Sequence, residues 1–146
     1  MKSEDDPISD DEWLIRRVFH DRMKNPPKIS KSAFEPRLNG NLPDVNGISL
    51  FRIDCLPDPK QILQTVRQDK QPFWGIVKLR VAEIRALNLS IAQDRIPEIP
   101  GHVLLPFLCC ERYRSDKPSC VAMMKELAKF ASEEGNIVHL PDSMQG

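Results

Sequence analysis

Proline is the feature that most constrains the fold of this sequence, because thirteen prolines interrupt its 146 residues. Proline fixes its own φ angle and has no backbone donor, so it ends helices and is excluded from central strands. We therefore expect many loops and few long elements. The length suits one domain with a hydrophobic core, and 40% hydrophobic with 29% charged residues is typical of a globular protein.

The charges balance, with 21 basic and 21 acidic residues, so net charge does not point to a nucleic acid or a membrane as the partner. The N-terminus has no apolar stretch typical of a signal peptide, and no apolar run approaches the roughly 18 residues of a membrane span. Two of the four cysteines are adjacent, and nothing suggests a disulfide framework. We expect a cytoplasmic protein with reduced thiols.

The order of local patterns predicts one compact α+β domain, with a mixed sheet of about four or five strands and about three helices. Residues 1–12 carry six acids and one lysine, which predicts a disordered acidic tail. Residues 13–146 form the predicted domain. Within it, residues 109–146 form a possible C-terminal addition that carries an amphipathic helix.

Alternation and capping signals place the individual elements. Strands are predicted at 13–19, 48–53, 89–95 and 102–107, the last of them central, with a possible edge strand at 136–140. One helix begins after Asp58, which can form a capping box with Gln61. Another is predicted from 77 to 87, ended by Asn88. The last helix begins near Pro118 and is closed by Gly135, and residues 25–47 are predicted as a long polar loop.

Four motifs follow one another between residues 13 and about 107: "LIRRV", "SKSAF", "ISLFRIDCLPDP" and "WGIVKLRVAEIRALNLSIAQDRIPEIPGHVLL". In this order they resemble a family of small bacterial proteins that has no assigned activity. The resemblance implies a short stand-alone domain and no particular activity or cofactor. It also makes the residues from Cys109 onward an addition to the family's pattern.

Arg16 and Arg17 are the first candidate binding residues, because a strand places one of them away from the core. With Ser32 in the polar loop they would supply the guanidinium and hydroxyl groups that suit phosphate recognition. The sequence has no phosphate-binding glycine loop and no aromatic stacking platform. Solvated basic residues therefore remain an alternative interpretation.

His102 is the candidate catalytic residue, since histidine titrates near neutral pH and suits proton transfer. It could equally be a residue that opens a strand. The cysteines and histidines lack the spacing of a zinc site, so we expect no metal site and no cofactor.

Two functions remain open. The first, narrowly preferred, is a non-enzymatic interaction protein that acts through a protein partner or through self-association. It predicts a contiguous exposed apolar patch. The alternative is a small enzyme or binder acting on a phosphorylated ligand, a nucleotide or RNA. It predicts that Arg16, Arg17, Ser32 and His102 line one concave pocket.

Overall fold

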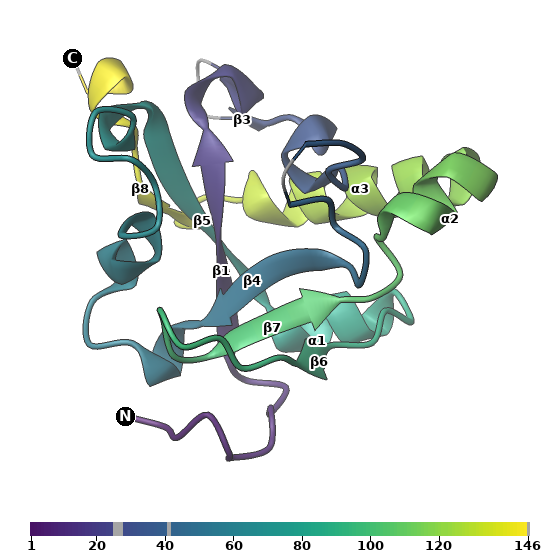
Figure 1. Cartoon of the computed structure of the whole chain (residues 1–146), viewed down its shortest axis with the longest axis horizontal. Coiled ribbons are helices and arrows are strands. Elements are labelled where there is room, and N and C mark those ends of the chain that lie inside the picture. Colours follow the sequence, from purple (N-terminus) through teal and green to yellow (C-terminus); the bar gives the residue numbers. More distant parts are fainter. Residues whose placement is uncertain (25–27, 41, 146) are drawn as a thin grey trace.

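A central β-sheet with helices packed against it forms the α+β fold seen in Figure 1, which confirms the predicted fold class. The computed structural model describes residues 1–24, 28–40 and 42–145. The sheet has six strands in the order β6-β7-β4-β1-β5-β8, and β2 and β3 pair separately. The sheet therefore has more strands than the four or five expected. Its pairings are antiparallel, so it is not the mixed sheet that we predicted.

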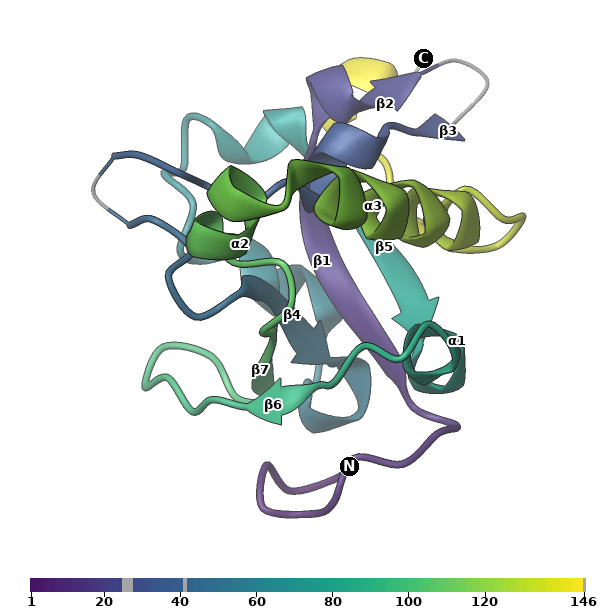
Figure 2. The ribbon, with the colours of Figure 1, turned by 90° about the vertical axis from the view of Figure 1, so that its right-hand side faces the viewer.

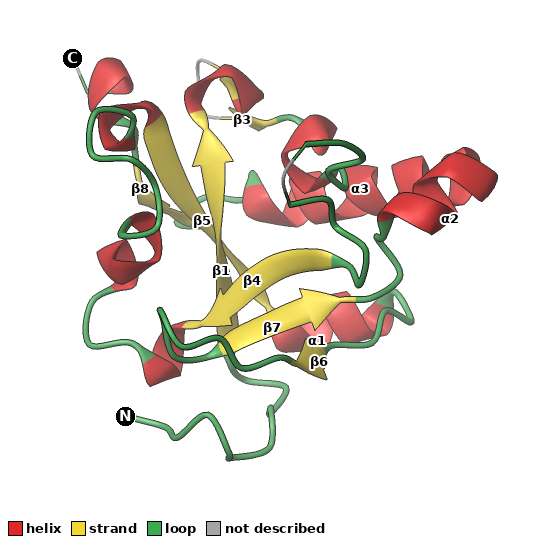
Figure 3. Cartoon of the chain, viewed as in Figure 1, coloured by secondary structure: helices red, strands yellow, loops and turns green. Residues whose placement is uncertain are grey.

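The elements are short and separated by many loops (Figure 3), as the proline content predicts. The strands are β1 (Trp13–Phe19), β2 (Met23–Lys24), β3 (Lys28–Ile29), β4 (Ile48–Arg52), β5 (Trp74–Arg80), β6 (Ala92–Gln93), β7 (His102–Leu105) and β8 (Ile137–His139). The α-helices are α1 (Val81–Ala86), α2 (Cys110–Ser115) and α3 (Lys117–Ala131). Short 3₁₀ helices occupy Lys31–Phe34 and Pro59–Leu63.

Each face of the sheet is buried against a different cluster. Leu14 and Val18 of β1 belong to the larger cluster, which includes residues of α1 and α3. Ile15, which alternates with them, packs with Phe51 and Ile62 in the smaller cluster on the other face. Figure 2 shows α3 lying across the sheet. Both faces of β1 are thus covered, as expected for a central strand.

The predicted strand at 13–19 is confirmed, and the predicted C-terminal helix is present as α3. The buried side chains of α3 include Met124, Leu127 and Ala131, all in the larger cluster. The helix therefore forms part of the core of the domain. Residues before it form α2, and the predicted edge strand is β8.

Other elements differ from the prediction. Residues 77–80 belong to β5, which pairs with β1 over its full length, and only Val81–Ala86 is helical. Asn88 ends this helix as predicted, with a φ of 63°. Asp58 forms the predicted capping box, but on a short 3₁₀ helix. β7 is second from the sheet edge and not central.

Residues 1–12 do not form the predicted disordered tail. Glu12 is 1% exposed and accepts two hydrogen bonds, of 2.8 and 3.0 Å, from Arg52 of β4. The Arg52 guanidinium also donates to three carbonyl oxygens of the same segment, those of Glu4, Asp6 and Pro7. The segment therefore follows a defined path, at the end of the sheet away from α3 (Figures 1 and 2).

The predicted loop at 25–47 contains β3 and the 3₁₀ helix Lys31–Phe34, while its residues 25–27 and 41 lie outside the described residues. Throughout the described ranges, no helix combines the length and the apolar character needed to cross a lipid bilayer.

Candidate functional site

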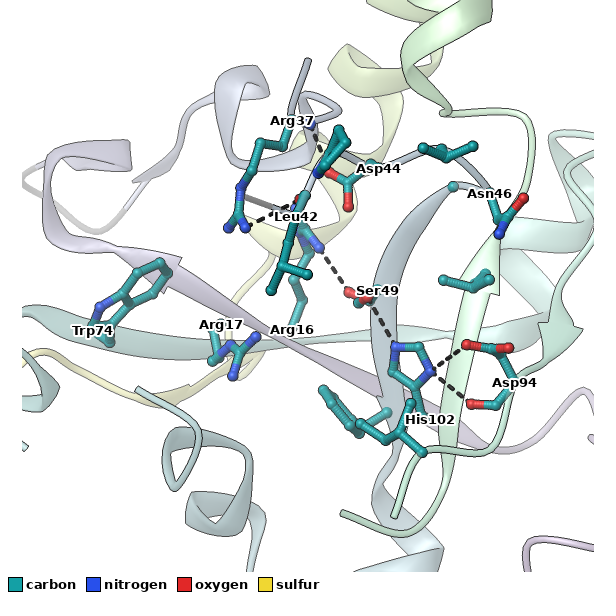
Figure 4. A pocket seen from close by; sticks show the side chains of 16 residues that line it. Arg16, Arg17, Arg37, Leu42, Asp44, Asn46, Ser49, Trp74, Asp94 and His102 are labelled. Atoms are coloured by element: carbon teal, nitrogen blue, oxygen red, sulfur yellow. Dashed lines mark hydrogen bonds and ion pairs between the residues drawn. The ribbon is translucent and has the colours of Figure 1, made fainter. Parts of the chain in front are cut away.

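A cavity of about 550 Å³ opens where the two central strands part. β1 pairs with β4 only at Leu14–Arg52 and Ile15–Phe51, and beyond these pairs the strands diverge (Figure 1). The side chains around the cavity are drawn in Figure 4. The lining residues are Arg16, Arg17, Arg37, Leu42, Pro43, Asp44, Val45, Asn46, Gly47, Ser49, Phe51, Trp74, Asp94, Ile96, His102 and Leu104.

Three arginines line this cavity. Arg16 donates from Nε to the carbonyl oxygen of Ala33 at 2.9 Å and from Nη1 to that of Ser49 at 2.7 Å. Arg17 donates from Nη1 to the carbonyl oxygen of Ile62 at 2.8 Å. Arg37 is exposed and contacts a neighbouring carbonyl oxygen at 3.3 Å. In the part of the chain that the structure describes, none of the three forms an ion pair.

The three charges destabilise one another. The pKa of Arg16 is lowered to about 10, mainly by burial; the charges of Arg17 and Arg37 also lower it, and the charge of Asp44 opposes them. Burial and the charge of Arg37 likewise lower the pKa of Arg17. The carboxylate of Asp44, which accepts a 2.6 Å hydrogen bond from the Arg37 backbone amide, offsets part of this repulsion at Arg16. An anion in the cavity would remove this repulsion.

On the opposite wall, His102 connects a serine and an aspartate (Figure 4). Its Nε2 lies 2.9 Å from the hydroxyl oxygen of Ser49. Its Nδ1 lies 2.7 Å from the carbonyl oxygen of Asp94 and 3.1 Å from a carboxylate oxygen of the same residue. The imidazole is 8% exposed and packs against the ring of Phe51, with centroids 5.1 Å apart.

Strand register explains this convergence. Phe51 of β4 is paired with His102 of β7, and Ser49 with Leu104. Residues two apart on a strand share one face, so Ser49 and His102 are diagonal neighbours on the same side of the sheet. Asp94 follows β6, which pairs with β7, and its loop returns to the histidine.

Three of the four predicted site residues, Arg16, Arg17 and His102, line this one cavity. Ser32 lines an adjoining cavity of about 370 Å³, which shares all three arginines, Asp44 and Trp74 with the first. The hydroxyl of Ser32 lies 2.9 Å from that of Ser30. The structure therefore places the four residues in two neighbouring cavities and not in the single pocket that was predicted.

Four residues that line the cavity were not predicted from the sequence: Ser49, Asp94, Arg37 and Trp74. Ser49 is a polar residue within an apolar strand, on the face that also carries Phe51, and this was a usable signal. Asp94 precedes His102 by eight residues, and only the β6–β7 pairing brings them together. Trp74 is half-buried and adds an aromatic side chain to the cavity, where the sequence suggested no aromatic platform.

The cysteines lie elsewhere and are free in the structure. Cys55, Cys110 and Cys120 are buried, and Cys109 is half-buried. Burial raises the pKa of the Cys55 and Cys120 thiols, which disfavours the reactive thiolate. Among the described residues, no three metal-ligating side chains are grouped as a metal site would require.

Comparisons with known proteins give no match to this chain, whether with protein-family models, with curated proteins or with solved structures. The resemblance to a bacterial family without assigned activity therefore stays a prediction.

Proposed function

We propose that this protein binds a phosphorylated ligand of the nucleotide class in the cavity between β1 and β4. The observation that supports this proposal most strongly is the group of three arginines, Arg16, Arg17 and Arg37, around one cavity and without ion pairs among the described residues. Guanidinium groups are the side chains best suited to phosphate oxygens. The cavity volume lies within the range of small-molecule sites.

Trp74 supports a nucleotide over a simpler phosphate ester. It lines the same cavity as the arginines and packs edge-on against Phe19, with ring centroids 5.1 Å apart. A tryptophan held in this way offers a face on which a base can stack. His102 would act on the bound ligand as the residue that moves a proton.

The test is calorimetric titration with inorganic phosphate, ribose 5-phosphate and AMP. AMP is expected to bind more tightly than ribose 5-phosphate, and Trp74→Ala is expected to remove that difference. Arg17→Ala is expected to weaken the binding of all three by on the order of tenfold, because a charge-assisted hydrogen bond contributes about 1.5 kcal/mol. Arg67→Ala is the matched control, since Arg67 pairs with Asp69 at the surface and lies outside the cavity.

The interaction-protein hypothesis, with a cytoplasmic location and a protein partner, stays a prediction. Leu42 and Val45 favour it, because they are 72% and 60% exposed and lie together at the cavity. If none of the three phosphorylated compounds binds, the phosphate proposal fails and this hypothesis becomes the better explanation of the same surface.

A further inference from the structure

The hydrogen bonds of His102 determine which ring nitrogen carries the proton. Both groups facing Nδ1, the carbonyl and the carboxylate of Asp94, can only accept a hydrogen bond. Nδ1 must therefore be the donor, and in the neutral ring Nε2 is the acceptor. Among the described residues, the only hydrogen-bond partner of Nε2 is the hydroxyl of Ser49, whose oxygen lies 2.9 Å away. This hydroxyl therefore donates its proton to the histidine.

This arrangement is that of an activated serine. A base that accepts the proton of the hydroxyl, and that is itself oriented by a carboxylate, is the requirement for a nucleophilic serine. Ser49 is half-buried and lines the cavity, so its oxygen is open to a bound ligand. The imidazole is held in place by Phe51, which keeps it in the orientation that proton transfer needs.

The arginines indicate what the serine attacks. Arg16 Nη1 donates to the carbonyl oxygen of Ser49 itself, so a positive charge lies beside the nucleophile. Its Nη2 atom has no hydrogen-bond partner among the described residues and remains open to a phosphoryl oxygen. Transfer from a phosphomonoester gains little from nucleophile activation, because its transition state is loose. A diester depends more on an activated nucleophile and on a proton for its alkoxide leaving group.

We propose that Ser49, activated by His102 and Asp94, attacks the phosphorus atom of a phosphodiester held by the arginines of the cavity. The bond from the Ser49 oxygen to phosphorus forms while the bond from phosphorus to one ester oxygen breaks. The serine proton passes to His102 Nε2, and the departing oxygen, on the opposite side of the phosphorus, takes a proton from water and leaves as an alcohol. Asp94 positions the imidazole and stabilises its charged form.

The second half of the reaction restores the enzyme. Water attacks the phosphorus of the seryl ester from the side that the alcohol left and gives a proton to the solvent, while His102 Nε2 still holds the serine proton. The bond between phosphorus and the Ser49 oxygen then breaks, and that oxygen takes the proton from Nε2. The net reaction is hydrolysis of a phosphodiester to a phosphomonoester and an alcohol, without any redox step. The substrate class rests on the proposed phosphate site, whereas the activation of Ser49 rests on the histidine contacts alone.

The first experiment is labelling with a fluorophosphonate, whose phosphorus is attacked by activated serines with loss of fluoride. Intact-mass measurement is expected to show one adduct per chain, and peptide mapping of the wild-type protein is expected to place it on Ser49. Ser49→Ala should abolish labelling, and His102→Gln should slow it at least tenfold. Ser90→Ala, at an exposed serine outside the cavity, is the matched control and should label normally.

The second experiment measures hydrolysis of bis(p-nitrophenyl) phosphate, with p-nitrophenyl phosphate and p-nitrophenyl acetate as comparisons. The diester is expected to be the best substrate, and its turnover should disappear in Ser49→Ala. No adduct on Ser49 would overturn the proposal even if AMP binds, which would leave the phosphate site standing by itself. An adduct on Ser49 with turnover of the acetate alone would also overturn it, since the serine would then act on carbonyl carbon.

Discussion

Glu12 should be essential to the stability of the domain, although it lies in a segment that the composition assigns to a disordered tail. The side chains of Glu12 and Arg52 are 0% and 1% exposed, and two hydrogen bonds join them. Glu12→Gln keeps the volume but removes the charge and turns one acceptor into a donor that faces the guanidinium. Removing one partner of a buried ion pair typically costs about 3–5 kcal/mol.

The expected loss for Glu12→Gln is about 3 kcal/mol, at the lower end of that range. Arg52 keeps three carbonyl acceptors in the same segment, so its charge is only partly uncompensated. A domain of this size has about 5–15 kcal/mol of stability. The melting temperature should therefore fall by roughly 6–12 °C.

The pH dependence gives a second measure of the same pair. Burial alone would raise the pKa of Glu12, but the hydrogen bonds and charge of Arg52 lower it below its ordinary 4.5 overall. A carboxylate with a lowered pKa in the folded state contributes stability above its unfolded pKa, and that contribution is lost as the pH falls below it. Wild type should therefore lose stability between about pH 5 and pH 3 more steeply than Glu12→Gln.

Urea denaturation at pH 7 and at steps down to pH 3, followed by tryptophan fluorescence, measures both effects. Asp69→Asn is the control, because the Arg67–Asp69 pair is exposed on both sides and should change stability by less than about 1 kcal/mol. Equal stabilities of Glu12→Gln and Asp69→Asn would refute the reasoning, and the N-terminal segment would then not belong to the folded unit.

Two further predictions concern single residues near the cavity and the core. Gly47→Ala should destabilise the protein by several kcal/mol in urea denaturation, roughly 3 or more, because Gly47 has a φ of 119° and an added Cβ would lie 2.3 Å from the carbonyl oxygen of Leu105. Gly40→Ala, at a φ of 94° with open space around it, should cost only about 1–2 kcal/mol, and equal losses would contradict the packing argument. The hydrogen bond from Tyr113 to Glu35, together with burial, raises the pKa of this single tyrosine to about 12, so absorbance at alkaline pH should show a midpoint near that value. Glu35→Gln should lower the midpoint toward 10. In the wild type, the raised pKa contributes stability below pH 10, and this contribution is lost as the pH rises to about 12.

Elements whose signals are local could be predicted from the sequence. The alternation in Trp13–Phe19 and the apolar stripe of Lys117–Ala131 each fall within one element, and both are confirmed. Val77 starts a helical spacing of apolar residues that continues through Val81 and Ile84, yet residues 77–80 pair with β1. Here long-range pairing overrides a local pattern, as is common for short apolar runs.

Composition also gave a wrong prediction for the N-terminal segment, because a long-range contact overrides it. Its six acids are typical of a solvated tail, but one of them pairs with a buried arginine forty residues away.

The candidate site could likewise be predicted only in part. Arginine and histidine were selected for their chemistry, whereas Ser49 was not, because its role comes from a histidine 53 residues distant. Residue type alone therefore predicted two of the arginines and His102, whereas Ser49 is identified only by the strand register.

Arg16 connects the fold to the proposed function. The carbonyl oxygen of Ser49 points toward β1, where a continued β1–β4 ladder would have supplied a backbone donor, and Arg16 Nη1 supplies it instead. A buried carbonyl must be hydrogen-bonded, so the strands can part here only because a side chain replaces the ladder. The same replacement places a positive charge beside the serine and opens the cavity. Substitution of Arg16 would therefore disturb the sheet as well as the charge, which is why Arg17 is the better position at which to test ligand binding.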